Sequence, residues 1–359
     1  MEVLHIHENY LPFKGGSAIR ISNILEAQLL RFNDKIDVLC SSDSRFFLRK
    51  ERLNGVNLIR IPYFRFLVFF ISIKLLIFNK YDVIHIHNSW LGILLFPLFF
   101  SNKKIVLELH SYKNQRGFKE LLHNFIINNA DSIIVLSRST KELLISKKLK
   151  SAEQIHIVIN GVDRKTFYPN RKKESLTKRL IYSGSLYDWQ GIKSIVDLAK
   201  LNKNSSVLRF LIVGNGPLSD WVKEQIAQNE LQNLKIMSFV EKNELIKLLS
   251  SSRAALILRP NLQQTNITFP LKILEYASLK IPIICTNRDA HFEILNKDQN
   301  RSDYFNIVSD DLNILNKEIL SIIDNIDLLE NKAANLFNHI SENNYSWLSS
   351  AENTRKAYV

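Results

Sequence analysis

The sequence predicts an α/β protein made of two doubly wound domains, and three observations support this prediction. Short runs rich in β-branched residues alternate with longer stretches of helical period, which indicates βα units around parallel sheets. The alternation occurs twice along the chain. The length of 359 residues suits two domains, since a domain has roughly 150 residues. We therefore expect two Rossmann-like domains.

The first half contains seven strand-like runs: EVLHIH, KIDVLC, VNLIRI, DVIHIH, KIVLEL, DSIIVL and QIHIVI. Stretches of helical period separate them, among them residues 17–30 and 117–129. Strands that alternate with helices in this way are typical of a sheet covered on both faces. We expect residues 1–169 to form the N-terminal domain.

The second half repeats the pattern with the runs RLIYSG, LRFLIVG, LKIMSF, AALILR and IPIICT, separated by helical stretches at 192–200, 218–227 and 245–251. The boundary is expected in NRKKESLTKR, residues 170–179, because this charge-dense stretch follows Pro169 and separates two strand-like runs. The second domain then covers 170–345. From Asp310 onward the pattern is helical, and the last amphipathic stretch, 346–359, can pack on either domain, including back on the first.

Composition and charge limit the class of protein. No window approaches the roughly 20 uncharged apolar residues of a spanning helix, the start lacks an export signal, and Cys40 and Cys285 are the two cysteines. We expect a cytoplasmic protein. The formal charge is +13, and residues 1–150 carry 22 Lys+Arg against 12 Asp+Glu. This excess favours an anionic partner such as a membrane surface or a phosphorylated substrate, or it is a solvated lysine-rich face. Nucleic acid is not expected, because the basic residues lack a recognition motif.

Residues 63–78, YFRFLVFFISIKLLIF, form the most apolar window, interrupted by Arg65 and Lys74. The window is too short to span a bilayer. Two alternatives stay open: a core helix packed on a sheet, or an interfacial helix that gives peripheral contact with the cytoplasmic membrane face.

Three local motifs suggest ligand binding. His5 with His7 and His85 with His87 lie on one face of a strand each, a geometry compatible with a metal, but no cysteine or carboxylate cluster accompanies them. We expect them at strand ends near the ligand-binding edge and expect no metal. Gly15 and Gly16, between a strand and a helix, suit close approach of an anion or form a plain turn; Gly214 in GNGPL is similarly ambiguous.

The stretch FPLKILEYA, residues 269–277, predicts a helix that begins at Pro270. Lys272 and Glu275 are three residues apart and share a helical face. They form either an ordinary i,i+3 ion pair or a pair in which the lysine meets a diphosphate and the carboxylate accepts hydrogen bonds from sugar hydroxyls. Spacing does not choose between these alternatives.

Four motifs occur in a characteristic order: INGVDRKTFYP at 159–169, IYSGSLYDWQGI at 181–192, LIVGNGPL at 211–218 and FPLKILEYASLKIPIICT at 269–286. Together with the GG loop, DVIHIH, ELHSY and ADSIIVLS, this succession resembles the retaining GT-B glycosyltransferases of family 4, the glycosyl transferases group 1. The resemblance covers nearly the whole chain. It implies the GT-B fold, with two Rossmann-like domains facing each other across a cleft, the acceptor held by the first domain and a nucleotide diphosphate sugar by the second.

The resemblance also implies roles for individual residues. Glu275 matches the second glutamate of the E-x7-E motif and would bind the donor ribose, and His110 in ELHSY would face the donor sugar. By the same resemblance, Lys272 would be the catalytic cation. The remaining residues of the implied donor site are Gly15, Gly16, Ser185, Gln190, Gly214, Arg259, Pro270, Leu271 and Glu293. Asn160, Gly161 and Asp163 match an interdomain turn.

The chain departs from the family pattern at Lys280, where a glycine is usual, and at three positions of the implied donor site. Ile267 stands where the first glutamate of E-x7-E is usual, and Ser185 and Gln190 replace the Arg and Lys that commonly clamp the diphosphate. Lys272 and Arg259 are the nearest candidates to supply that positive charge.

We expect transfer of a sugar, with retention, from a nucleotide diphosphate sugar to a glycan or lipid-linked saccharide in cell-surface polysaccharide synthesis, with neither cofactor nor metal. Two alternatives remain: a non-catalytic partner of another transferase, suggested by the three departures, and a sugar-nucleotide epimerase.

Overall fold

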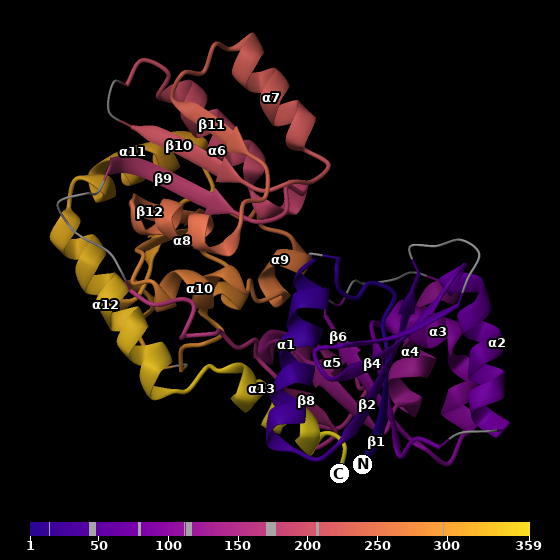
Figure 1. The fold of residues 1–359 in the computed structure, drawn as a ribbon. Coiled ribbons are helices and arrows are strands. Elements are labelled where there is room, and N and C mark those ends of the chain that lie inside the picture. Colours follow the sequence, from indigo (N-terminus) through magenta and orange to yellow (C-terminus); the bar gives the residue numbers. More distant parts are fainter. Residues whose placement is uncertain are drawn as a thin grey trace. The chain divides into compact units, whose positions relative to one another are not determined.

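The computed structural model describes residues 1–13, 15–42, 48–77, 80–110, 112, 117–169, 177–205, 208–296 and 298–359. The chain divides into two compact units: unit 1 comprises Met1–Gly161 and Ser346–Val359, and unit 2 comprises Val162–Tyr345. Each unit is built on a largely parallel sheet with flanking helices (Figure 1), which confirms the predicted α/β class. Most of the expected boundary segment, residues 170–176, lies outside the described residues.

The described part of unit 1 holds an eight-stranded sheet in the order β3-β4-β2-β1-β5-β6-β7-β8. Its strands are β1 Glu2–Ile6, β2 Lys35–Ser41, β3 Arg49–Leu53, β4 Val56–Ile61, β5 Val83–His87, β6 Lys104–Leu109, β7 Ser132–Val135 and β8 Ile155–Ile157. Its helices are α1 Gly16–Arg31, α2 Phe64–Ile77, α3 Ser89–Leu94, η1 Phe96–Phe100, α4 Phe118–Asn129, α5 Arg138–Ser146 and α13 Trp347–Lys356. Because β1 pairs with β2 on one side and β5 on the other, the carboxyl ends of β1 and β5 form the switch point where open sheets bind ligands.

Strand β3 has no counterpart among the predicted strands. It pairs antiparallel with β4 through a turn at Asn54 and Gly55, both of which have positive φ. An Asn-Gly pair is a strong signal for a two-residue hairpin turn. The hydrophobic pattern missed β3 because its sequence, RKERL, is charged and mostly exposed at the sheet edge.

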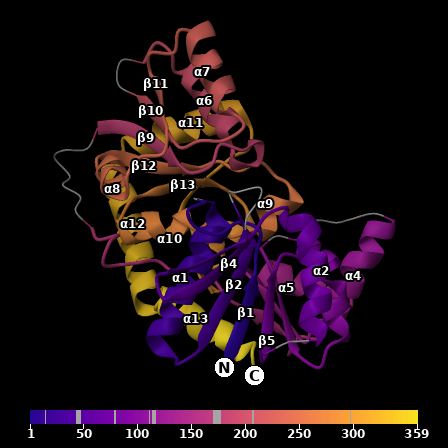
Figure 2. The same cartoon turned by 45° about the vertical axis from the view of Figure 1, so that its right-hand side comes forward.

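The C-terminal helix α13 packs beside α1 in unit 1 (Figure 2). Ala351 is buried against Ile24 and Ala27 of α1. Arg355 donates to both carboxylate oxygens of Asp34, over 2.9 and 3.1 Å, and Tyr358 is buried beneath the sheet. Gly161 lies against this helix, because a Cβ there would come within 2.3 Å of the Trp347 nitrogen.

The described part of unit 2 holds a six-stranded parallel sheet in the order β11-β10-β9-β12-β13-β14. Its strands are β9 Thr177–Ser183, β10 Arg209–Val213, β11 Leu234–Met237, β12 Ser252–Ile257, β13 Ile283–Thr286 and β14 Asn306–Val308. Its helices are η3 Asp188–Gln190, α6 Ile192–Leu201, α7 Ser219–Gln228, α8 Lys242–Ser250, α9 Gln263–Ile267, α10 Lys272–Ser278, η4 Asp289–Phe292, η5 Arg301–Asp303, α11 Leu312–Ile323 and α12 Ile326–Glu342. The order reverses between β9 and β12, so the switch point of this sheet lies at their carboxyl ends. Among the described residues, no helix is both long enough and apolar enough to cross a bilayer.

Candidate functional site

The sequence-predicted residues of unit 2 follow the carboxyl ends of its strands. Ser185 follows β9, Gly214 follows β10, and Arg259 follows β12, while Glu293 follows β13 and η4. Lys272 and Glu275 lie on α10, between β12 and β13. The sheet therefore places these residues along the edge at which doubly wound folds bind nucleotides.

The Lys272 ammonium lies over an aromatic ring and has no hydrogen-bond partner among the described residues. Its Nζ lies 3.9 Å from the centroid of the Tyr182 ring, and the nitrogen is buried without a hydrogen bond among the described residues. Gly184, with φ of 141°, leaves room for it, because a Cβ there would come within 2.8 Å of Nζ. Burial, and next the charge of Arg259, hold the pKa of Lys272 well below its usual value, although Glu275 acts in the opposite direction.

Glu275 does not form the ordinary ion pair with Lys272. No ion pair within 4.0 Å joins these two side chains, both of which the structure describes. Burial raises the pKa of Glu275, and the positive charges of Lys272 and Lys242 only partly oppose that shift. The i,i+3 interaction therefore does not explain why a lysine and a glutamate occupy this apolar helix.

Arg259 is the second buried cation of this edge. Its Nε donates to Oε1 of Gln190 over 3.3 Å and one Nη donates to the Thr268 carbonyl over 2.7 Å. Its guanidinium lies 5.1 Å from the Trp189 ring centroid. Burial lowers the pKa of Arg259 to about 10. Gln190, at the position where the family commonly has a lysine, thus orients an arginine.

The glycine-rich turns of unit 2 are required by backbone packing. Gly214 has φ of 152°, and a Cβ there would lie 1.8 Å from the Gly184 carbonyl oxygen. The Ser185 carbonyl accepts a hydrogen bond from the Tyr182 hydroxyl over 2.8 Å. Close packing of these two turns therefore fixes the ring that lies beneath Lys272.

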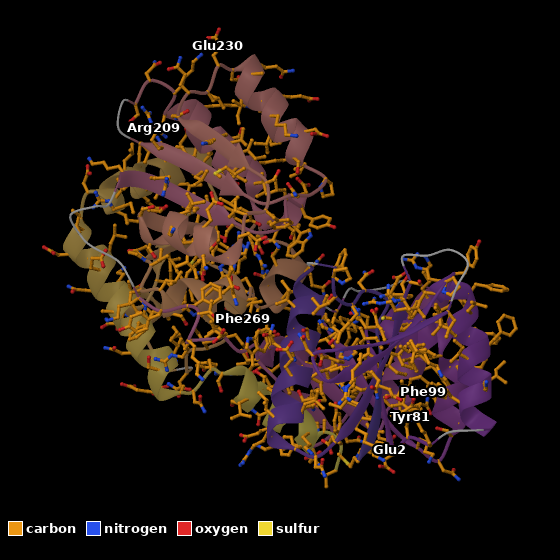
Figure 3. The ribbon with its side chains drawn as sticks, in the orientation of Figure 1. Glu2, Tyr81, Phe99, Arg209, Glu230 and Phe269 are labelled. Atoms are coloured by element: carbon orange, nitrogen blue, oxygen red, sulfur yellow. The ribbon has the colours of Figure 1, made fainter. Side chains whose placement is uncertain are left out.

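Helix α10 begins at Lys272, two residues after the predicted start at Pro270. The carbonyls of Pro270 and Leu271 accept from the next turn, over 3.1 and 3.0 Å, so both residues lead into the helix. Phe269, labelled in Figure 3, is buried and anchors this entry. Glu293 is buried directly after η4.

His291 is a residue of this edge that sequence reasoning missed. Its Nδ1 lies 2.9 Å from the Thr286 carbonyl oxygen. Burial, and next the charge of Arg259, hold the pKa of His291 well below its usual value. Its position two residues before Glu293, a residue of the implied donor site, is the signal that could have found it.

In unit 1, His110 follows β6 and contacts a buried carboxylate. Its Nε2 lies 3.1 Å from Oε1 of Glu108. Burial lowers the pKa of His110 to about 3, so the ring is neutral at physiological pH. The two atoms are close but do not form a hydrogen bond, because Nε2 of His110 is buried without a hydrogen-bond partner among the described residues.

Glu108 is neutralised by Arg20, a pairing that the sequence analysis did not identify. Nε of Arg20 donates to Oε1 of Glu108 over 2.9 Å, and its two Nη atoms donate to Oδ1 of Asn160 and to the Val158 carbonyl. Burial alone would raise the pKa of Glu108, but Arg20 above all holds it well below its usual value. Arg20 also explains Asn160, which the resemblance assigned to a structural turn.

The two HxH pairs lie side by side on β1 and β5, where His5 is paired with His85. Nδ1 of His5 lies 3.0 Å from Nε2 of His87, and the Tyr358 hydroxyl lies 2.9 Å from Nδ1 of His85 and 3.2 Å from Nε2 of His5. Burial holds the pKa values of His5 and His87 well below their usual value. The rings of His5 and His87 are therefore neutral and bonded to each other, and the Tyr358 hydroxyl links His5 to His85.

Two overlapping groups have spacing compatible with a metal ion: His5, His85 and His87, and His87, Glu108 and His110. The Arg20 guanidinium, however, already bonds to the carboxylate. A divalent ion would add positive charge beside this buried cation, which is unfavourable in a low-dielectric interior. The charge of Arg20 therefore disfavours a metal ion at the group that contains Glu108, although Nδ1 of His87 and Nε2 of His110 have no hydrogen-bond partner among the described residues.

Gly15 and Gly16 stand at the start of α1, directly after the loop that follows β1. Gly15 is the N-cap and lies against the Phe13 ring, whereas a Cβ on Gly16 would meet open space. The first turn of α1 carries no acidic residue. This arrangement keeps the helix N-terminus of unit 1 available to an anion.

Family models match both halves of the chain. The model described as glycosyl transferases group 1 matches residues 163–344, and the model of glycosyltransferase family 4 matches residues 14–166. The chain belongs to this family. The two matched regions follow one another along the chain in the order expected from the sequence motifs.

Among curated relatives, the glycosyltransferase is 25% identical over 246 residues to 2-deoxystreptamine N-acetyl-D-glucosaminyltransferase of Niallia circulans, covering 60% of this chain and 61% of that one. It is 24% identical over 236 residues to UDP-Gal:alpha-D-GlcNAc-diphosphoundecaprenol alpha-1,3-galactosyltransferase of Escherichia coli, covering 60% of each chain. The chain thus spans about three fifths of the length of these relatives.

Solved structures share the fold over the whole chain. Sucrose-phosphate synthase from Thermosynechococcus elongatus has a TM-score of 0.80 at 17% identity and covers 99% of this chain and 98% of its own. Anabaena Alr3699/HepE in complex with UDP-glucose has a TM-score of 0.76 at 15% identity with the same coverage. These likenesses confirm the GT-B fold.

Proposed function

We propose that this glycosyltransferase transfers a sugar from a UDP-sugar to a lipid-linked saccharide, with retention at the anomeric carbon, in cell-surface polysaccharide synthesis at the cytoplasmic face of the membrane. Unit 2 binds the donor, and unit 1 binds the acceptor. The Escherichia coli relative named above uses a UDP-sugar and a diphosphoundecaprenol-linked acceptor, and the Anabaena structure contains UDP-glucose. Both support this choice of substrates.

The pair of buried cations in unit 2 carries the proposal. Lys272 and Arg259 lie at the nucleotide-binding edge of the sheet, and no carboxylate within 4.0 Å pairs with either one among the described residues. A buried charge without a partner is costly to the protein alone, and this cost is the cause of the depressed pKa of Lys272. A diphosphate supplies two negative charges and several acceptor oxygens, so its binding at this edge offsets that cost.

The reaction follows from the same charges. The bond between the anomeric carbon and the diphosphate oxygen breaks, the acceptor oxygen bonds to that carbon from the same face, and the acceptor hydroxyl proton passes to the departing diphosphate. Lys272 and Arg259 stabilise the negative charge that grows on the diphosphate in the transition state. Glu275 accepts hydrogen bonds from the ribose hydroxyls, and His110 offers a ring nitrogen to a sugar hydroxyl. No step requires a metal ion.

A second candidate function is that of a non-catalytic partner of another transferase. Ser185, Gln190 and Ile267 replace three polar or charged residues of the family pattern, and Ile267 is buried. The structure weakens this alternative at Gln190, whose side chain orients Arg259.

The experiment that separates the two candidates uses the purified chain alone. Thermal shifts with UDP, GDP and their sugars identify the donor, and transfer of labelled sugar to an undecaprenyl-diphosphate-linked saccharide measures turnover. Stabilisation by UDP-sugars together with transfer supports the proposed function. Stabilisation without transfer to any lipid-linked acceptor, unless a second transferase is added, supports the partner protein.

A further inference from the structure

Unit 1 exposes large aromatic side chains on three neighbouring elements, α2, η1 and α4. Phe66 on α2 is 66% exposed, Phe100 on η1 is 69% exposed and Phe118 on α4 is 73% exposed. The same elements also expose Phe70, Ile73, Phe96, Leu121 and Phe125. We call these eight residues the aromatic surface. Soluble monomers rarely expose contiguous apolar patches of this kind without a binding function.

Apart from Phe118, the rings of this surface form a continuous series of contacts. Phe66 contacts Phe70, with ring centroids 5.3 Å apart, and Phe70 contacts Phe69 at 5.6 Å. The series continues from Phe69 to Phe96 at 6.0 Å. Along η1, Phe96 contacts Phe100 with ring centroids 6.5 Å apart, and Phe100 contacts Phe125 of α4 at 6.3 Å.

Figures 1 and 2 show α2 and α4 on the same side of the unit 1 sheet, and Figure 3 labels Phe99, a half-buried residue of η1 between them. Packing of α2 against η1, and of η1 against α4, joins the three elements into one face. Helix α2 therefore buries only part of its apolar side chains. The core-helix alternative accounts for Phe64 and Val68, which are buried, but not for the exposed face that carries Phe66 and Phe70.

Basic residues accompany this surface. Lys74 and Lys119 are exposed and Lys103 is half-buried, and among the described residues no ion pair involves their ammonium groups. Glu120 is the acidic residue on these helices. The surface thus combines phenylalanines with uncompensated positive charge.

We propose that the aromatic surface docks this glycosyltransferase on a lipid bilayer that contains anionic phospholipids. Phenylalanine side chains enter the boundary between headgroups and acyl chains, while the lysines meet the lipid phosphates. A second copy of the chain is a poor occupant, because it would bring like charges together, and lysine is depleted at the cores of protein interfaces. Docking would give access to a lipid-linked acceptor, and this benefit rests on the proposed function. The docking proposal itself does not depend on that function.

Vesicle flotation of the purified chain, without donor or acceptor, tests the proposal. The chain is expected to float with vesicles of equimolar phosphatidylglycerol and phosphatidylcholine, and to bind phosphatidylcholine vesicles alone at least about tenfold less tightly. The double variant Phe66→Ser/Phe100→Ser should bind the anionic vesicles about tenfold or more less tightly. The variant Phe239→Ser is the matched control, because Phe239 is an exposed phenylalanine of unit 2; it should bind as the wild type does.

A second variant, Lys74→Glu/Lys119→Glu, tests the charge without changing the rings and should abolish the preference for anionic vesicles. Absence of vesicle binding by the wild type would overturn the proposal. So would a concentration-dependent dimer that Phe66→Ser/Phe100→Ser dissociates, which would assign the surface to a second copy. Vesicle binding without sugar transfer would contradict the proposed function alone, and transfer to a soluble acceptor without vesicle binding would contradict the docking surface alone.

Discussion

The two units differ in whether their buried charged side chains have an oppositely charged partner. In unit 1, Arg20 pairs with Glu108 over 2.9 Å, and the imidazoles of His5, His87 and His110 are neutral. In unit 2, Lys272 and Arg259 are buried near one another, and Lys272 rests on an aromatic ring instead of a carboxylate. The comparison teaches that unit 1 presents hydrogen-bonding groups without net charge, which suits sugar hydroxyls, whereas unit 2 retains positive charge, which suits a diphosphate.

This difference in pairing predicts that substitutions in unit 1 affect stability, whereas substitutions in unit 2 affect activity. A compensated buried pair supports the fold of the free protein, because loss of one partner leaves the other charge unpaired. An uncompensated buried cation costs stability until its ligand binds. Substitutions in the two clusters are therefore expected to have different signatures.

The largest effect is expected from Glu108→Gln in unit 1. The change leaves the Arg20 guanidinium buried without its carboxylate, and should lower the free energy of unfolding by about 3–5 kcal/mol. Chemical denaturation followed by circular dichroism measures it. The control is Glu352→Gln, which breaks the exposed ion pair with Arg31 and should cost no more than about 1 kcal/mol. Equal effects of the two variants would show that the buried pair of Arg20 and Glu108 does not stabilise unit 1 more than a surface ion pair does.

Lys272→Met in unit 2 should have the opposite signature. Turnover should fall by about 10²–10³-fold, because a preorganised positive charge is removed from the leaving group. Stability of the ligand-free protein should not decrease, since the variant removes a buried unpaired ammonium. Steady-state kinetics and thermal melting measure the two quantities, with Lys193→Met, at an exposed lysine paired with Asp188, as the control. Wild-type turnover would remove Lys272 from the reaction.

Acid should weaken the contact between the neutral rings of His5 and His87 in unit 1. Burial depresses the pKa values of His5 and His87, so the folded state binds fewer protons than the unfolded state. Their contribution to stability is complete above the unfolded pKa of about 6.5 and decreases as the pH falls below it, by roughly 1.4 kcal/mol per pH unit for each histidine. Denaturation at a series of pH values tests this, and the double variant His5→Gln/His87→Gln should show a flatter dependence. An equally steep dependence in that variant would assign the acid sensitivity elsewhere.

The smallest effect is expected from Glu275→Gln. The donor dissociation constant should rise about tenfold, since one charge-assisted hydrogen bond to the ribose becomes a neutral one, with little change in turnover. Calorimetric titration with UDP-glucose measures it, with Glu244→Gln, at an exposed glutamate of α8, as the control. If Glu275→Gln instead destabilised the free protein as Glu108→Gln does, the two clusters would be alike and the comparison would fail.

The fold could be predicted because its information is local. Alternating β-branched runs and helical stretches indicated the strands that carry the site, and the motif around Lys272 and Glu275 indicated α10 to within two residues. The charged strand β3 was not predicted, because its sequence lacks alternating hydrophobic residues. The turn that precedes β4, at Asn54 and Gly55, was the available signal.

The site could be predicted only in part. Motifs singled out Lys272, Arg259 and His110 as candidates, but they did not show which groups each side chain contacts. Arg20 and Glu108 are 88 positions apart, so no local pattern links them. Likewise, the spacing of Lys272 and Glu275 allowed an ion pair, and only the three-dimensional placement of Lys272 over Tyr182 decided against it.

The most direct test of the central claim, that unit 2 retains its positive charge for a diphosphate, is calorimetric titration of the wild type and Lys272→Met with UDP and with UMP. The account predicts that the wild type binds UDP about tenfold or more tightly than UMP, because the second phosphate meets the buried cations. It also predicts that Lys272→Met loses most of that preference while its affinity for UMP changes little. Equal affinities of the wild type for UDP and UMP, or an undiminished preference in Lys272→Met, would contradict it.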